Sequence, residues 1–165
     1  MKSLLFLFLF FCLNISNLNA NEKIAFVDLN YILSESNSGK KILQDLNSLS
    51  KKNEEIFKST ESDLNDQQNE IKKLKNIISE TEYNEKINKL KKEVTNYNKL
   101  KADKLKSFEN EKKTELDNFF LSLNEILNKY MKENNINIII EKKSVIMANK
   151  VLDVRNNVIK LLDGN

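Results

Sequence analysis

The sequence has no proline, no histidine and no tryptophan, and only two glycines among its 165 residues. Proline and glycine interrupt helices, so their scarcity permits helices of unusual length. Histidine and cysteine are the commonest acid–base catalysts and metal ligands. The single cysteine is Cys12, and Gly39-Lys40 lacks the upstream glycine of a phosphate-binding loop. These absences predict a protein that is not an enzyme and that uses no cofactor or metal.

Charged residues are abundant, but their balance is close to neutral. They make up 31% of the chain, aromatic residues only 8%, and the formal net charge is +3. A nucleic-acid-binding protein gathers many more cations on one face. The composition therefore predicts a solvated helical rod rather than a large globular core, and no nucleic-acid partner.

Residues 1–20 are predicted to be a signal peptide. Lys2 supplies the positive start, an apolar run extends from Leu4 to Leu13, and Ala20 is a small residue suited to cleavage. A helix needs about 20 apolar residues to span a bilayer, and this run is shorter. An uncleaved membrane anchor is the alternative. Cys12 lies within this leader, so the exported chain would contain no cysteine.

Residues 21–39 are predicted to form the first part of a small body. The apolar run at 22–29 indicates a buried strand. Residues 30–36 are expected to make one or two helical turns. Ser38-Gly39 is the expected break before a long helix.

Residues 134–165 are predicted to form the second part of the body. A β-forming run at 136–141, a tight turn at 141–143 and a second strand at 145–148 give a β-hairpin, and Asp153 is placed to cap a final helix. The two parts together are small for a stable core, and their strands leave open edges. The body is therefore expected to be an assembly interface.

Residues 40–133 are predicted to form a helical hairpin. In its first helix Phe57, Leu64, Ile71 and Ile78 are seven residues apart, which is the spacing of a coiled-coil seam. A turn is expected near 79–83, where Ser79 and Glu82 match a capping box. One uninterrupted rod is the alternative. The hairpin is favoured because a single helix has no partner for its seam.

The second helix follows a different period. Two series of residues recur every eleven positions: Tyr83, Val94, Leu105, Leu116 and Leu127, and Tyr97, Phe108, Phe119 and Tyr130. An eleven-residue repeat gives about 3.67 residues per turn and straightens a coiled coil or turns it right-handed. The aromatic series is interpreted as core seam, and the coil is expected to be irregular.

Charge is distributed unevenly along the hairpin. Residues 45–70 carry seven acidic residues against three lysines, and the facing stretch 90–115 carries eight lysines against five acidic residues. Opposite charges beside a seam favour this pairing. The tip is basic through Lys72, Lys73, Lys75, Lys86, Lys89 and Lys91. It is interpreted either as a solvated face or as a weak electrostatic hook for acidic clients or an anionic membrane.

Three segments resemble the Skp (OmpH) family of periplasmic chaperones: NEKIAFVDLNYIL, SGKKILQDL and the ending NINIIIEKKSVIMANKVLDVRNNVIKLL. The resemblance implies a homotrimer with a small β body and three helical-hairpin arms around a cavity. It implies a holdase that keeps unfolded outer-membrane proteins from aggregating without ATP. The expected trimer-body residues are Ile24, Phe26, Ile138, Ile140, Val145 and Met147. The best-known members are strongly basic, whereas this chain has Arg155 as its only arginine, so we assign no lipopolysaccharide site.

The predicted fold is mainly α with a small β body. A long antiparallel coiled-coil hairpin forms an arm on a β-strand trimerisation base, in a jellyfish-like homotrimer. The predicted function is a periplasmic holdase for unfolded outer-membrane β-barrel proteins, with weak anionic membrane contact at the arm tips. The alternative is a structural coiled-coil spacer or adaptor of the cell envelope.

Overall fold

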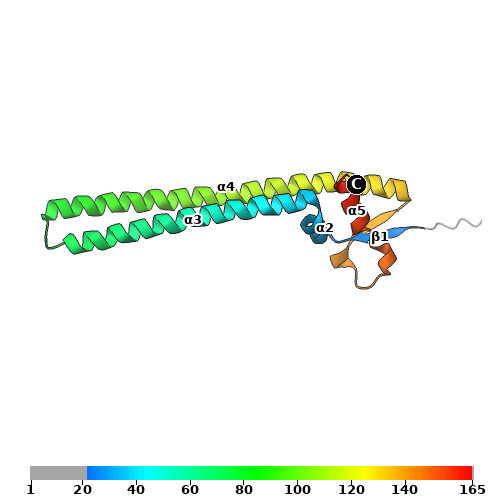
Figure 1. The fold of residues 1–165 in the computed structure, drawn as a ribbon, viewed down its shortest axis with the longest axis horizontal. Coiled ribbons are helices and arrows are strands. Elements are labelled where there is room, and N and C mark those ends of the chain that lie inside the picture. Colours follow the sequence, from blue (N-terminus) through cyan, green and yellow to red (C-terminus); the bar gives the residue numbers. More distant parts are fainter. Residues whose placement is uncertain (1–21, 165) are drawn as a thin grey trace, which may run out of the picture.

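The computed structural model describes residues 22–164, so the predicted signal peptide lies outside the described residues. A hairpin of two long helices projects from a small body that holds both ends of this range (Figure 1). The elements follow the order β1 (Ile24–Val27), α2 (Leu29–Glu35), α3 (Asn37–Leu74), α4 (Glu80–Asn134), β2 (Ile138–Glu141), η1 (Lys142–Ser144), η2 (Lys150–Leu152) and α5 (Arg155–Leu162). The prediction of a mainly helical chain with a small sheet is confirmed.

The chain enters the arm through a tight junction of α2 and α3. Ser36 ends α2 and also begins α3, where its buried hydroxyl accepts a hydrogen bond from the Gly39 N–H at 3.2 Å. Gly39 lies in the first turn of α3, and a Cβ there would lie 1.9 Å from the Leu33 carbonyl oxygen. The predicted break at Ser38-Gly39 is therefore wrong. The helix starts at Asn37, and glycine is needed for close packing against α2.

The arm is a hairpin, as predicted, and its turn lies slightly earlier than 79–83. α3 has 38 residues and α4 has 55, and they are joined by residues 75–79. Ser79 is the N-cap of α4, and its hydroxyl accepts a hydrogen bond from the Glu82 N–H at 3.3 Å. At 1.5 Å per residue α4 is about 80 Å long.

The aromatic series of α4 forms its seam, as predicted. Tyr97, Phe119 and Tyr130 are buried, whereas Val94 and Leu105 of the aliphatic series are 39% and 49% exposed. α3 contains a second series of residues spaced seven apart, and this series includes polar residues: Leu46, Asn53, Thr60, Gln67 and Leu74. Asn53 is 7% exposed, so a polar side chain occupies a buried layer of the seam. The middle of the arm is therefore weakly packed for a coiled coil.

The body is built on a two-stranded parallel sheet. β1 and β2 pair in the register Ile24 to Ile138 and Phe26 to Ile140. The C-cap of α4 is Asn135, which has the left-handed conformation (φ 54°) that asparagine tolerates well. One side of the sheet packs into the core, where these side chains are buried: Ala25, Val27, Ile32, Phe119, Leu123, Tyr130, Val154 and Val158. The core thus joins both ends of the described chain to the root of the arm.

The predicted β-hairpin after α4 is wrong in its second half. Residues 142–144 form a short 3-10 helix instead of a tight turn, and no strand forms at 145–148. The chain instead passes to the other side of β1, where the Val154 N–H donates to the Phe26 carbonyl oxygen at 3.1 Å. α5 follows, with Val154 rather than Asp153 as its N-cap, although the Asp153 carboxylate accepts a hydrogen bond from the Arg155 N–H at 3.2 Å.

Candidate functional site

The face of the sheet that points away from the core is apolar and only partly covered. Side chains alternate between the two faces of a strand, so Ala25 and Val27 enter the core while Ile24 and Phe26 lie opposite. The strand register places Ile24 beside Ile138 and Phe26 beside Ile140. Ile24 is 43% exposed and Ile138 is 46% exposed. The structure therefore brings together four of the six predicted body residues.

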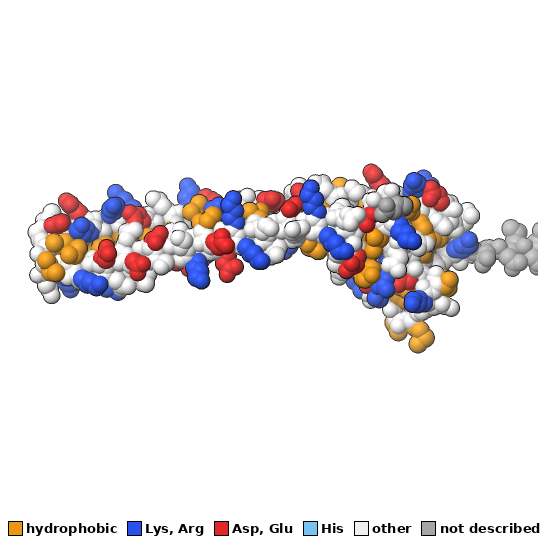
Figure 2. All heavy atoms as spheres, in the orientation of Figure 1, with side chains coloured by type: hydrophobic (Ala, Val, Ile, Leu, Met, Phe, Trp, Pro, Cys, Tyr) orange, Lys and Arg blue, Asp and Glu red, His pale blue; other side chains and the backbone are white. Residues whose placement is uncertain are grey.

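The other two predicted body residues lie on the loop between η1 and η2. Val145 is half-buried, whereas Met147 is 92% exposed and its neighbour Ile146 is 103% exposed. Val151 of η2 is also 77% exposed. Hydrophobic side chains protrude from the body on the side away from the arm helices (Figure 2). Ile146 escaped the sequence analysis, although the unbroken apolar run of residues 145–148 was the signal for it.

A groove follows the open side of β2. It has a volume of about 470 Å³ and is lined by β2 with the residue before it, by the root of α4, and by the ends of β1 and α2: Val27, Leu29, Asn124, Leu127, Asn128, Met131, Asn137, Ile138, Ile139 and Glu141. Its lining is apolar at the centre, with asparagines and one carboxylate around it. The groove, the outer sheet face and the loop are three candidate binding surfaces of the body.

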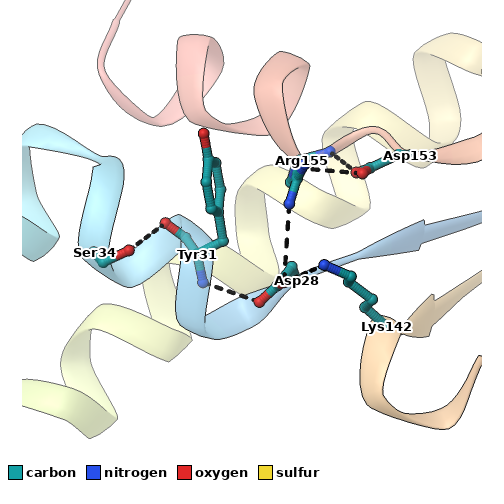
Figure 3. Close-up of polar contacts among 6 residues, drawn as sticks. All are labelled: Asp28, Tyr31, Ser34, Lys142, Asp153 and Arg155. Carbon is teal, nitrogen blue, oxygen red and sulfur yellow. Dashed lines mark hydrogen bonds and ion pairs between the residues drawn. The ribbon is translucent and has the colours of Figure 1, made fainter. Parts of the chain in front are cut away.

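A group of charged side chains ties the parts of the body together (Figure 3). The Asp28 carboxylate caps α2 by accepting from the Tyr31 N–H at 3.0 Å, and Lys142 Nζ lies 3.0 Å from it. Arg155 lies 3.9 Å from Asp28 and 3.2 Å from Asp153, and its guanidinium stacks 4.2 Å from the Tyr31 ring centroid. The Tyr31 N–H and then Lys142 hold the pKa of Asp28 below its usual value.

Sequence analysis did not find this group. Asp28 was placed within a strand, although an aspartate just before a helical run is a recognisable N-cap signal. Arg155 was noted only as the single arginine. Its partners lie more than 120 residues away at Asp28 and Tyr31, so no local pattern indicates them.

A second polar group bridges the two helices in the middle of the arm. The Tyr97 hydroxyl donates a hydrogen bond to Glu61, and Lys101 Nζ lies 2.8 Å from the same carboxylate oxygen. Lys101 also lies 5.4 Å above the Phe57 ring centroid, and the Phe57 and Tyr97 rings meet edge to face. We call Phe57, Glu61, Tyr97 and Lys101 the arm clasp. The predicted pairing of an acidic α3 stretch with a basic α4 stretch is realised here.

The arm clasp shifts the pKa values of its members. The hydrogen bond from Lys101, and then that from Tyr97, lowers the pKa of Glu61. The Glu61 carboxylate raises the pKa of Lys101, while desolvation and then Glu61 raise the pKa of Tyr97. Glu61 is thus held ionised and Lys101 and Tyr97 protonated, so the bridge persists over a wide pH range.

The predicted basic residues lie at the end of the arm far from the body. Lys72 and Lys73 form the last turn of α3, Lys75 follows in the turn, and Lys86, Lys89 and Lys91 lie in the first part of α4. Lys86 is half-buried, and Lys89 lies 3.9 Å from Glu93. Ile77, which sequence analysis did not single out, is 74% exposed in the turn between them. The tip therefore combines cations with an exposed apolar side chain.

These arrangements offer surfaces that are suited to binding. Between residues 22 and 164 no group of carboxylates and thiols has the geometry of a metal site. The same range has no helix that combines the length and the hydropathy of a membrane span. What the structure offers is a partly covered apolar face on the body and a long arm with charged and scattered apolar side chains.

Comparisons with known proteins agree with this architecture. The profile of the family described as outer membrane protein (OmpH-like) matches residues 23–162. A crystal structure from Caulobacter crescentus CB15, assigned as an outer membrane chaperone (OmpH-like), superposes with a TM-score of 0.80 at 14% identity, over 87% of this chain and 85% of that chain. None of the curated proteins compared with the chain matches it. The resemblance that the three sequence segments indicated is confirmed: the chain belongs to the family of OmpH-like outer membrane proteins.

Proposed function

We propose that this chain is an ATP-independent periplasmic holdase chaperone. It binds unfolded outer-membrane β-barrel proteins after their export and prevents their aggregation, in a cavity between the arms of a homotrimer. Membership of the OmpH-like family carries the proposal, because this is a family of periplasmic chaperones and not of enzymes. Export depends on the predicted signal peptide at residues 1–20.

The shape of the chain supports a holdase. Unfolded clients differ in sequence, so they are held best by many weak contacts of low specificity. The long arm offers such contacts, because apolar side chains such as Val94, Leu100 and Leu105 stay 39–49% exposed between charged residues. Release then follows from the more favourable folding of the client into a bilayer.

Trimerisation through the body is the second part of the proposal. Ile24, Phe26, Ile138 and Ile140 form an apolar sheet face that one chain covers only partly. Val145 and Met147 lie on the adjoining loop. Contacts between copies remove these apolar surfaces from water, which stabilises the assembly.

The alternative function is a structural spacer or adaptor of the cell envelope. A spacer also uses a long coiled coil, but it needs no body that joins both chain ends. An aggregation assay decides between the two functions. Trimer at one equivalent is expected to suppress the aggregation of a denatured outer-membrane β-barrel on dilution from urea. Unchanged aggregation would remove the chaperone function and favour the spacer.

The arm tips are proposed to make weak contact with an anionic membrane. Lysines around the exposed Ile77 combine positive charge with an apolar side chain, a combination suited to an anionic bilayer interface. Replacing the six tip lysines by glutamine should reduce sedimentation with phosphatidylglycerol vesicles at low salt. The control variant replaces six lysines nearer the body: Lys99, Lys104, Lys106, Lys112, Lys113 and Lys129. Equal loss in both variants, or none in the first, would contradict a tip-specific contact.

A further inference from the structure

A groove lies between the two helices in the middle of the arm. It has a volume of about 450 Å³, which is within the range of small binding pockets. α3 supplies one wall and α4 supplies the other. We call it the mid-arm groove, and these residues line it: Thr60, Asp63, Leu64, Gln67, Glu93, Asn96, Tyr97 and Leu100. It lies beside the arm clasp and shares only Tyr97 with it.

The centre of the mid-arm groove is apolar and partly open to water. Tyr97 is 8% exposed, Leu64 is half-buried and Leu100 is 42% exposed. A bound side chain that covers Leu100 and Leu64 would remove further apolar surface from water, which favours binding. The groove can therefore hold an apolar side chain of a partner.

The charged residues that line the groove are both acidic. Asp63 belongs to α3 and Glu93 to α4. Glu93 lies 3.9 Å from Lys89, whereas Asp63 forms no ion pair with any other of residues 22–164. Between Lys58 and Lys72 α3 carries four carboxylates, one of them in the arm clasp, and no lysine or arginine. The groove is therefore acidic, in contrast to the basic tip.

Two amide side chains complete the lining. Gln67 lies on the α3 wall and Asn96 on the α4 wall. Each amide has donors and an acceptor, so it can bond to the backbone of an extended chain of any sequence. The groove thus combines an apolar centre and backbone-binding groups of low specificity with charges of one sign.

We propose that the mid-arm groove binds extended segments of unfolded clients in which an apolar side chain is next to a lysine or an arginine. The apolar side chain lies against Leu64 and Leu100. The cation lies between Asp63 and Glu93. This proposal rests on the holdase function proposed above and names the kind of client segment that the arm selects.

The strands of outer-membrane β-barrels contain such segments. Their side chains alternate between apolar residues that face the lipid and polar residues that face the lumen, so a cation of the lumen face stands next to an apolar residue. Lysine and arginine place their apolar stems on apolar surface and their charge at its rim. Acidic segments are repelled by the like charge, so the groove discriminates by charge while it tolerates different sequences.

Peptide binding to the exported chain tests the proposal. The probe is a short peptide that alternates leucine and lysine, and a second peptide has glutamate in place of lysine. The leucine methyl groups of the chain are isotopically labelled and followed by NMR during titration. The lysine peptide should shift the signals of Leu64 and Leu100 but not that of Leu121, which is 63% exposed elsewhere on α4. The glutamate peptide should bind at least about tenfold more weakly.

Neutralising the two carboxylates tests the role of charge. Asp63→Asn with Glu93→Gln should raise the Kd of the lysine peptide about fivefold to tenfold at low salt and leave the helical circular dichroism signal unchanged. The matched control, Asp66→Asn with Glu85→Gln, removes one exposed carboxylate from each helix outside the groove and should change this Kd less than about twofold. Equal effects in the two variants would mean attraction by the overall charge of the arm and would overturn the proposal.

A second substitution tests the apolar centre. Leu100→Gln removes exposed apolar surface from the groove and should raise the Kd of the lysine peptide about fivefold or more. Leu121→Gln makes the same change at an exposed position of the same helix and should leave the Kd unchanged. A lysine peptide that binds Leu100→Gln as tightly as the wild type would be attracted by charge alone, which contradicts a groove that selects apolar and cationic side chains together.

The aggregation assay separates the failure of this proposal from the failure of the holdase function. A chain that suppresses aggregation but shows no peptide-induced shift at Leu64 and Leu100 overturns the groove and keeps the holdase. A chain that binds the lysine peptide in the groove but does not suppress aggregation removes the holdase and keeps the groove as a peptide site. A wild-type mass that doubles with concentration, and no longer does so in the Asp63→Asn, Glu93→Gln variant, would assign the groove to a second copy and overturn the proposal.

Discussion

The arm and the body bury their residues in different ways. The body concentrates a cluster of eight buried residues drawn from β1, α2, α4 and α5. The arm is far longer, yet its buried seam residues are spread out: Leu46, Asn53, Ile71, Leu90 and Tyr97. The concentrated core keeps the body rigid, whereas the widely spaced contacts of the arm permit its helices to separate locally. One chain thus combines a firm base with an arm that can open locally.

The two regions also use polar groups differently. In the body the Asp28, Lys142 and Arg155 group joins segments that are distant in sequence, around a core that already holds them. In the arm Glu61 and Lys101 bridge two helices whose seam contains Asn53, Thr60 and Gln67. The Glu61–Lys101 bridge therefore contributes a larger share of the stability of the arm, because less apolar packing holds the two helices together there.

The largest difference should appear on truncating a buried side chain of the body. Leu123 is 1% exposed, and Leu123→Ala is expected to lower the free energy of unfolding by about 2–5 kcal/mol through lost burial and a cavity. Leu121→Ala lies two residues away at 63% exposure and should change it by less than about 0.5 kcal/mol. Urea unfolding followed by circular dichroism measures both. If both substitutions changed the free energy of unfolding equally, this would contradict a core at the root of α4.

The junction of body and arm should be the next most sensitive place. Gly39→Ala would place a methyl group against the Leu33 carbonyl, so α2 and α3 must separate. We expect a loss of about 1–3 kcal/mol by overpacking. Ser38→Ala, at the exposed neighbouring position, controls for the change in helix propensity and should be nearly neutral. A stabilised Gly39→Ala chain would mean that the contact is looser than the structure has it.

A substitution in the seam should stabilise the arm, in contrast to the two destabilising substitutions described above. Asn53→Leu replaces a buried polar side chain in the seam by an apolar one, with an expected gain of about 1 kcal/mol. Hydrogen exchange of the mid-arm amides should slow, while exchange in the body stays unchanged. Asn47→Leu on an exposed position is the control. Unchanged exchange would show that the polar layer does not limit arm stability.

The sequence predicted the arm better than the body, for a physical reason. Helices and their seams depend on residues three to eleven apart, so the spacing of Phe57, Ile71 and Tyr97 was visible. Strand pairing depends on distant partners, and the pattern at 145–148 predicted a strand without indicating whether an edge was available. For the arm clasp the sequence predicted only that an acidic stretch of one helix faces a basic stretch of the other. The pairing of Glu61 with Lys101 depends on the register of the two helices.

The smallest expected effect separates the arm clasp from ordinary surface charge. Glu61 has a lowered pKa, so the stability it contributes is present above its ordinary value of 4.5 and is lost as pH falls through the lowered value. Glu61→Gln should remove this acid dependence from mid-arm hydrogen exchange and leave exchange in the body unchanged. Added salt should weaken the wild-type arm only slightly, because the Glu61 pair is reinforced by the Tyr97 hydroxyl. Glu109→Gln, whose lysine partner lies 4.0 Å away on the same helix, is the matched control. If both variants behave alike, the clasp is no more than an exposed ion pair, and the arm depends on its sparse apolar seam alone.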